Sequence, residues 1–124
     1  MDENDISRLE WITEEAGFLL EITYGLNLDD FLTDRLLQHG VVMALINIGE
    51  SANSLNKKLK EKHPHIDWQG ITDLRNIAAH NYGGLRMPWI WKNATRDVPD
   101  LLEQVEEILR AEGVDTEDVT SDHV

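Results

Sequence analysis

Apolar residues recur along most of the chain at the three- and four-residue spacings of amphipathic α-helices. No Val-, Ile- and Thr-rich alternation between turn residues predicts a strand. The first helix is expected over about residues 5–24, and the acidic residues near its start suit the positive end of the helix dipole. Gly25 and Asn27 then break the pattern, which predicts a turn.

The second helix is expected to be long, from about residue 30 to about residue 62. Between Val41 and Leu59 the apolar residues alternate between spacings of four and three, a seam suited to a neighbour at a shallow crossing angle. Gly49 would permit a partner helix to approach closely. Pro64 should end the helix, because proline disfavours helical geometry in the residue before it.

Two more helices follow in the pattern. The third should begin with Asp67 as its N-cap and stop near the pair Gly83–Gly84. The fourth is expected over about residues 88–111, and Pro99 inside it predicts a kink or two shorter helices.

These elements predict an all-α fold, an up-and-down helical bundle of four to five helices. The length of 124 residues fits a single domain with one core, which we expect over residues 1–111. Residues 112–124, with the sequence EGVDTEDVTSDHV, are expected to form an acidic, flexible tail.

Net charge adds a second pattern. A formal net charge of -13 argues against nucleic acid as a partner, because phosphates repel an acidic surface. The acids are concentrated at the two ends, however: residues 1–34 and 97–124 each carry a net -9, whereas residues 35–96 carry +5. The middle of the chain is therefore suited to a phosphate-bearing partner, although such segregation can also be a solvated surface.

The composition excludes several classes of protein. Without cysteine, neither disulfides nor thiolate metal sites can hold the chain together. No apolar run approaches the roughly 18 residues of a membrane span, and the acidic N-terminus does not resemble a secretion signal. We therefore predict a cytoplasmic protein with no membrane partner.

The sequence RNIAAHNYGG, residues 75–84, is the candidate for chemistry. Arg75 offers a fixed, charged fork that matches a phosphate, and His80 can take or give a proton near neutral pH. Cleaving RNA without a metal needs a base for the ribose 2′-hydroxyl and positive charge at phosphorus, which His80 and Arg75 could supply. The same two residues could also be ordinary surface or capping residues near a helix end.

Their spacing is unfavourable for a pair within one helix. Side chains five residues apart on a regular helix point about 140° away from each other. Arg75 and His80 could still share a site if the chain leaves helical geometry around His80. They could also share one if a second copy of the chain supplies half of the site.

The stretch RNIAAHNY matches the R-x4-H-x-Y motif, and through it the chain resembles the HepT-like branch of the HEPN superfamily of small helical proteins. INIGESANSL is similar to the IGEA stretch of that family, and HPHIDWQGITDLRN to its P-x-I-x-W-x-x-I-x-x-x-R-N run. Trp91 and the run from Val98 to Leu101 resemble its last helix, so the likeness covers about residues 35–110. The loop GGLRMPW departs from the pattern, since many relatives have an aromatic residue, one glycine and an acidic residue there.

The resemblance implies an endoribonuclease that acts as the toxin of a prokaryotic toxin–antitoxin pair and dimerises so that two motifs meet across a cleft. By carry-over, Arg75 would stabilise the phosphate and His80 would act as general acid and base. Asn76 would orient the site or touch the RNA. Tyr82 matches the tyrosine that a cognate minimal nucleotidyltransferase antitoxin modifies with AMP.

Other side chains could support such a site. Glu50 could orient Arg75 through an ion pair or could simply be solvated, and Arg86 could add phosphate affinity. Trp89 and Trp91 could stack on bases, or they could fill a core or a dimer seam. We expect the acidic ends on the far side of the molecule and the following basic residues nearer the RNA path: Lys57, Lys58, Lys60, Lys62, Arg86, Lys92 and Arg96.

A metal site is a weaker interpretation of the histidines. His63 and His65 flank a proline and could join His80, but no cysteine or carboxylate pair accompanies them, and a turn explains them as well. We therefore predict a metal-independent enzyme without a cofactor. Its expected partners are RNA, a second copy of the chain (or a higher oligomer) and the nucleotidyltransferase. The alternatives are a non-catalytic module that binds a nucleotide or a partner, and a purely structural helical dimer.

Overall fold

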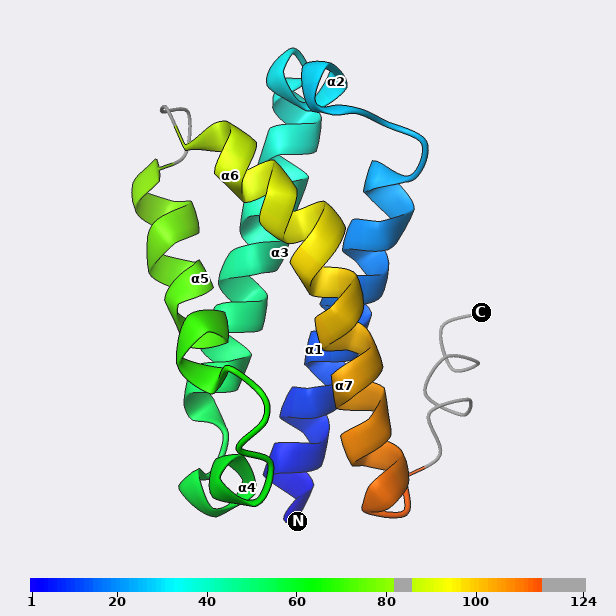
Figure 1. Ribbon diagram of the computed structural model, residues 1–124, viewed down its shortest axis with the longest axis vertical. Helices are drawn as coiled ribbons and strands as arrows, with labels where there is room; N and C mark the ends of the chain where they lie inside the picture. The colour runs from blue at the N-terminus through cyan, green and yellow to red at the C-terminus, as the bar shows by residue number, and fades with distance from the viewer. Residues whose placement is uncertain (82–85, 115–124) are drawn as a thin grey trace.

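The computed structural model describes residues 1–81 and 86–114. Three long helices, α1 (Glu3–Thr23), α3 (Arg35–Ser54) and α5 (Trp68–Asn81), are followed by a continuous helical rod. This rod consists of α6 (Met87–Lys92), the π-helix η1 (Asn93–Asp97) and α7 (Val98–Ala111). The four long segments alternate in direction along the bundle, as Figure 1 shows, and no strand occurs in the described ranges. The predicted all-α, up-and-down bundle is confirmed.

The single long helix predicted over residues 30–62 is wrong. The chain forms α2 (Leu28–Leu32), α3 and α4 (Lys57–Lys62) instead. Short polar side chains begin each new helix: Asn27 and Asp30 form a capping box, and the Asp34 carboxylate accepts a bond of 3.1 Å from the Leu37 N–H. Asn56 likewise accepts from the Lys58 N–H at 2.9 Å. The local hydrogen bonds of these caps outweigh the hydrophobic pattern, which by itself would predict a helix that continues through the breaks.

The expected interruption at Pro99 takes the form of a π-helical turn. The Val98 N–H donates to the Asn93 carbonyl five residues earlier, which is the π-helical pattern. Pro99 has no N–H to donate, so the wider turn that ends just before it leaves fewer carbonyls without a partner. The rod therefore continues through the proline rather than ending there.

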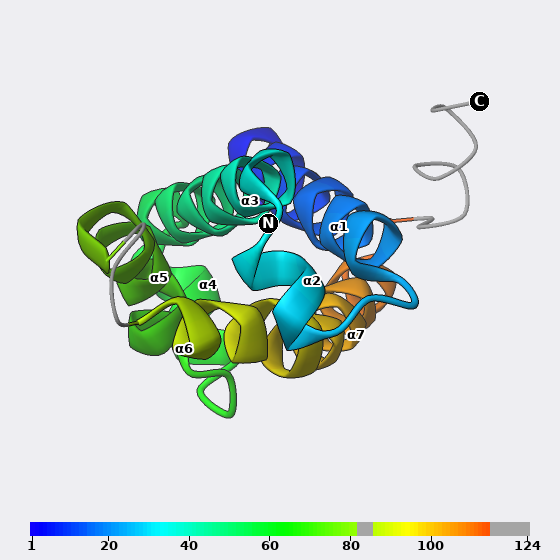
Figure 2. The ribbon, with the colours of Figure 1, turned by 90° about the horizontal axis from the view of Figure 1, so that it is seen from above.

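The core runs the length of the bundle and is closed at one end by α2. Figure 2 shows α2 lying across that end, where the fully buried Phe31 stacks on Trp91 with ring centroids 5.0 Å apart. Trp91 therefore fills the core instead of offering a free stacking surface. The largest fully buried side chains come from every layer: Leu9, Ile12, Leu19, Leu45, Ile48, Ile90, Val105 and Leu109.

Polar contacts tie the other end of the bundle together. Buried Asp5 accepts a hydrogen bond of 3.0 Å from the Asn56 backbone N–H. Glu112 accepts from the Lys62 ammonium at 2.7 Å and lies 3.9 Å from the N-terminal ammonium of Met1. The N-terminus, α4 and the end of α7 thus meet here. The tail predicted over residues 112–124 begins in this cluster, and its residues 115–124 lie outside the described part of the chain.

None of the described helices combines the length and the apolar character that crossing a membrane requires.

His63 follows α4, and its Nε2 is buried without a hydrogen-bond partner among the described residues. Burial lowers the pKa of His63 below its ordinary value of 6.5, and the nearby charges of His65 and Lys62 lower it further. Glu112 opposes this shift with a smaller effect. Because the unfolded chain then binds the proton more readily than the folded chain, the free energy of unfolding must fall as the pH drops below 6.5.

We expect His63→Gln to remove part of that loss of stability, because glutamine does not titrate. Urea denaturation of wild type and variant between about pH 5 and pH 7.5, the range around an ordinary histidine pKa, measures it. His65→Gln should remove less of the loss, since His65 contributes only through its charge. An equally steep fall of stability in His63→Gln and wild type would contradict this account.

Candidate active site

The close approach of α5 to α3 positions Arg75. Asp67 caps α5 by accepting a bond of 3.0 Å from the Gly70 N–H, and the helix then packs along α3. At Gly49 of α3, a Cβ atom would lie 2.7 Å from the Arg75 nitrogen and 2.9 Å from the Arg75 Cβ. A side chain at Gly49 would therefore push Arg75 away. The Arg75 Nη1 lies 3.4 Å from Glu50 Oε1 in a partly exposed ion pair.

His80 lies on a different side of α5. The helix extends to Asn81, so the chain does not leave helical geometry at His80, and that interpretation of the motif is wrong. Arg75 therefore points about 140° away from His80 around the helix axis. His80 is exposed, as is Asn76 one turn before it on nearly the same face. Within one subunit, the guanidinium faces α3 while the imidazole faces solvent.

Two other residues that the sequence suggested for the site, Arg86 and Tyr82, come at the start of α6 or before it. Arg86 is the N-terminal flanking residue of α6, is exposed, and makes no side-chain capping bond. Tyr82 lies outside the described residues. The end of α5 and the start of α6 meet at the same end of the bundle, as Figure 1 shows, so Arg86 belongs to the His80 end of the molecule.

The basic residues expected along one RNA path fall into two separate groups. Those of α4 lie at the opposite end of the bundle from α6 (Figure 1), and there Lys62 is paired with Glu112 and Lys57 with Glu61. Arg86, Lys92 and Arg96 are exposed along α6 and η1. Figure 2 shows α5 at one edge of the bundle and α1 and α7 toward the other, but the acidic segments are not confined to the far side, since Glu112 pairs with Lys62 and Asp97 lines a cavity beside α5.

Comparison with known proteins agrees with this arrangement. A family model described as "Ribonuclease HepT-like" matches residues 12–108, which include α5 and most of the bundle. The chain belongs to the HepT-like ribonuclease family. The likeness expected from the R-x4-H-x-Y motif is confirmed, and with it the prediction of an endoribonuclease at the level of the family.

Curated relatives of this HepT-like chain come from bacteria and archaea. TTE0752 of Caldanaerobacter subterraneus subsp. tengcongensis, named as a candidate RNase, is 36% identical over 104 residues, covering 84% of this chain and 93% of that protein. A protein of Thermococcus cleftensis named as a probable ribonuclease HepT is 32% identical over 100 residues, covering 81% of this chain and 91% of its own length. No solved structure matches the chain significantly.

The described residues of this HepT-like chain form no group of three or more His, Asp or Glu side chains placed to hold a metal ion. His63 and His65, which the sequence suggested as a pair, have ring centroids 6.1 Å apart in an edge-to-face arrangement. They lie at the α4 end of the bundle, whereas His80 lies at the α6 end, as the course of α5 in Figure 1 makes clear.

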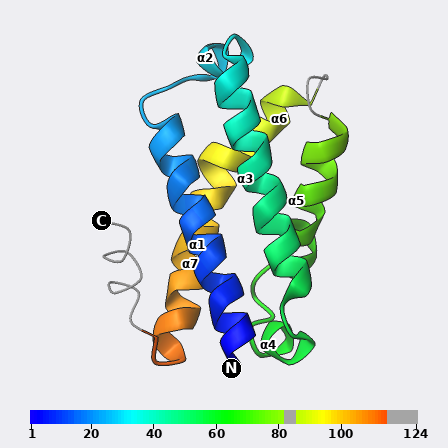
Figure 3. The ribbon, with the colours of Figure 1, turned by 180° about the vertical axis from the view of Figure 1, so that it is seen from behind.

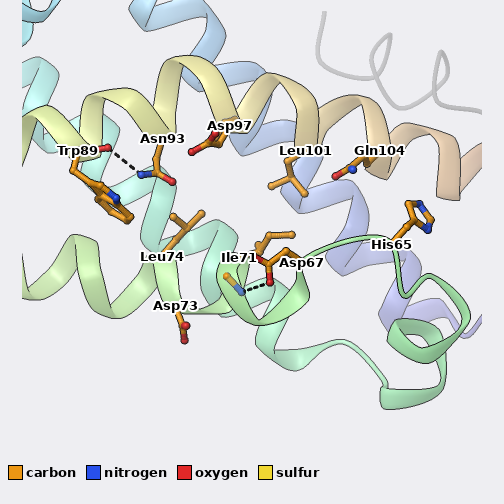
Figure 4. Close-up of a pocket in the computed structure, with 12 residues that line it drawn as sticks. His65, Asp67, Ile71, Asp73, Leu74, Trp89, Asn93, Asp97, Leu101 and Gln104 are labelled. Atoms are coloured by element: carbon orange, nitrogen blue, oxygen red, sulfur yellow. Dashed lines mark hydrogen bonds between the residues drawn. The ribbon is translucent and has the colours of Figure 1, made fainter.

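A cavity that the sequence did not predict opens on the other flank of α5. Its volume is about 440 Å³, and it separates α5 from the rod of α6, η1 and α7. Figure 4 shows Trp89, Asn93 and Asp97 on the rod, with Leu74 of α5 pointing toward them. Of the three rod residues, only Trp89 was considered from the sequence as a ligand contact. The four-residue spacing of Trp89, Asn93 and Asp97 was the available signal, because such residues share a helix face.

Substitution of Gly49 tests how Arg75 is positioned. We expect Gly49→Ala to lower the free energy of unfolding by about 1–2 kcal/mol, because crowding against α5 outweighs the better helix propensity of alanine. The matched control is Gly17→Ala in α1, where an added Cβ would meet no atom within 4 Å. That variant should gain up to about 1 kcal/mol. Equal stability of the two variants in urea denaturation would contradict the close approach described here.

Proposed function

We propose that this HepT-like chain is a metal-independent endoribonuclease whose site is shared between two subunits, with Arg75 of one subunit acting beside His80 of the other. The observation that carries the proposal is the helical geometry of α5 through Asn81. It directs Arg75 toward α3 and His80 toward solvent, so one subunit does not present both groups to a single phosphate. A two-fold dimer can present them together.

The chemistry follows from the two side chains. His80 would remove the proton of a ribose 2′-hydroxyl, and the 2′-oxygen would attack the adjacent phosphorus. Arg75 would stabilise the charge that develops on the phosphate oxygens, while its ion pair with Glu50 keeps the guanidinium in place. The 5′-oxygen leaves and takes up a proton. The products are a 2′,3′-cyclic phosphate and a 5′-hydroxyl end.

An exposed apolar groove on the bundle supports association with a second copy. It lies between α1 and α3, which Figure 3 shows side by side, has a volume of about 590 Å³, and is lined by Phe18, Ile22, Leu36 and Met43 among others. Leu36 and Met43 are 83% and 56% exposed. Leu36, Met43 and Glu50 recur every seven residues and so share one face of α3. A second copy covering this face would also reach the Glu50–Arg75 pair.

The proposed biological role rests on the resemblance to the HepT-like family and on the names of the curated relatives. Their names as RNases support RNA as the substrate. We infer that the chain is the toxin of a toxin–antitoxin pair and that a nucleotidyltransferase antitoxin neutralises it by attaching AMP to Tyr82. The added phosphate would bring negative charge close to the motif, where it would compete with the RNA phosphate for Arg75.

Mixing two inactive variants tests the shared site. Arg75→Ala and His80→Ala should each lower cleavage of a single-stranded RNA in the presence of a chelator by about 100-fold or more. Refolded together in equal amounts, the two variants should recover about a quarter of wild-type activity, because half of the dimers are mixed and each mixed dimer keeps one intact site of two.

Each variant refolded alone is the control. No recovery in the mixture, with mixed dimers present by native mass spectrometry, would contradict a site shared in this way. Loss of all wild-type cleavage on adding chelator would contradict the metal-independent mechanism. If wild type binds RNA or a nucleotidyltransferase tightly but cuts no RNA, the chain is instead a non-catalytic binding module.

Modification of Tyr82 tests the proposed regulation. Incubation with a minimal nucleotidyltransferase of the proposed antitoxin class and ATP should add the mass of one AMP unit and abolish cleavage. Peptide mass spectrometry locates the added mass, and Tyr82→Phe should stay unmodified and active. The exposed Tyr24 is the internal control for unspecific modification. An AMP unit on the Tyr82→Phe chain would remove the assignment.

A further inference from the structure

The cavity between α5 and the α6–η1–α7 rod contains acceptor oxygens that no described group engages. Asn93 is only 8% exposed, and its amide nitrogen donates to the Trp89 carbonyl at 3.0 Å. That bond fixes the orientation of the amide, so the Asn93 oxygen is directed into the cavity, as Figure 4 shows. Asp97 lies one turn further along the rod, and its carboxylate has no hydrogen-bond or ion-pair partner in the described ranges.

Two of the other polar groups of the cavity are engaged, and His65 and Gln104 lie toward its far end, away from Trp89 (Figure 4). The Asp67 carboxylate accepts from the Gly70 N–H at 3.0 Å, and the Asp73 carboxylate accepts from the Gln69 amide at 2.8 Å. The free hydrogen-bonding capacity near the Trp89 end is therefore that of Asn93 and Asp97, three oxygen atoms that can only accept. A ligand for this cavity must present hydrogen-bond donors beside a flat apolar surface that suits Trp89.

We propose that this cavity is a base-binding subsite of the ribonuclease and that it selects guanine. Guanine carries adjacent N1–H and N2–H₂ donors, so two of its hydrogens match the two oxygens of Asp97 and the third matches the Asn93 oxygen. Adenine and cytosine place an acceptor beside their amino group, and uracil has one N–H between two carbonyls. The volume of about 440 Å³ lies within the range of roughly 300–1,000 Å³ typical of small-ligand sites.

The cavity itself is lined by three carboxylates, those of Asp67, Asp73 and Asp97, so the phosphate of a bound nucleotide must lie outside it, beside exposed cations. Lys92 and Arg96 are exposed, and each directly precedes a residue that lines the cavity. Ile90 and Ala94, which directly follow the lining residues Trp89 and Asn93, are buried. Both cations therefore lie on the solvent side of the cavity. There they attract a phosphate backbone.

The position of the cavity relative to the motif supports the same conclusion, which rests on the proposed ribonuclease function. Asp73, Asn76 and His80 follow one stripe of α5 at spacings of three and four residues, in which Asp73 is half-buried and Asn76 and His80 are exposed. Asp73 lines the cavity, and seven residues of helix separate it from His80 by about 10 Å. An RNA strand following this stripe can place its scissile linkage at His80 and a base close to it in the cavity.

Binding of mononucleotides tests the subsite without requiring cleavage. We expect 5′-GMP, titrated into the full-length chain, to shift the NMR signals of the Trp89 indole and the Asn93 amide. It should bind about tenfold more tightly than 5′-IMP, which lacks only the N2 amino group. Asp97→Asn should weaken this preference, because it replaces one of the two accepting oxygens of Asp97 by a donor, while Asn93 still accepts from the N2 amino group. Asp100→Asn, with the same loss of charge at an exposed position three residues on, should preserve the preference.

The outcomes separate the two proposals. Equal binding of GMP, IMP and AMP, or a preference for GMP that is unchanged in Asp97→Asn, would overturn the guanine subsite even if RNA is cut. Binding of N-acetylarginine amide at Trp89 with displacement of GMP would overturn it in favour of a cationic partner.

A preference for GMP that depends on Asp97, in a chain that cuts no RNA, would support the subsite and count against the ribonuclease. Cleavage next to guanine whose base preference weakens in Asp97→Asn supports both.

Discussion

The contact between Gly49 and the backbone of α5 governs the geometry of both flanks of that helix. With no side chain at Gly49, the Arg75 backbone comes close enough to α3 for the guanidinium to reach Glu50. On the opposite flank α5 makes few close approaches to α6, η1 and α7, and the cavity occupies the space between them. One glycine thus places Arg75 on one flank of α5, while the cavity lies on the other.

The regularity of α5 has a consequence for assembly. A helix that continues through His80 separates the two motif side chains by about 140°, and no rotamer change of either residue brings both to one atom of the same subunit. Under the proposed mechanism the site would depend on a second copy, and activity would become a function of association. For a ribonuclease that could harm its own cell, this dependence would offer a point of control besides covalent modification.

How much the sequence predicts differs from element to element. The periods of α1, α5 and the α6–α7 rod, and the N-cap at Asp67, are local signals, and the structure follows them. The break at Asn27 was predicted, but those at Asp34 and Asn56 were missed because each depends on one side chain outcompeting a hydrophobic seam. Arg75 and His80 were proposed from the R-x4-H-x-Y motif and the chemistry of their side chains. The separation of the basic residues into two groups could not be predicted, because it depends on the ends of the bundle at which α4 and α6 lie.

Pro99 connects the least regular part of the fold to the cavity. A proline in the middle of a rod usually costs about 3 kcal/mol or more, and here a π-helical turn accommodates it. That turn contains both Asn93 and Asp97. In a regular α-helix the angle between these two residues around the helix axis would differ, and so would the choice of which one faces α5. The irregular turn therefore does more than accommodate the proline, since it fixes which oxygens line the cavity. A π-helical insertion of this kind costs stability. Its presence where the oxygens of Asn93 and Asp97 lack partners is easiest to understand if a ligand supplies those partners.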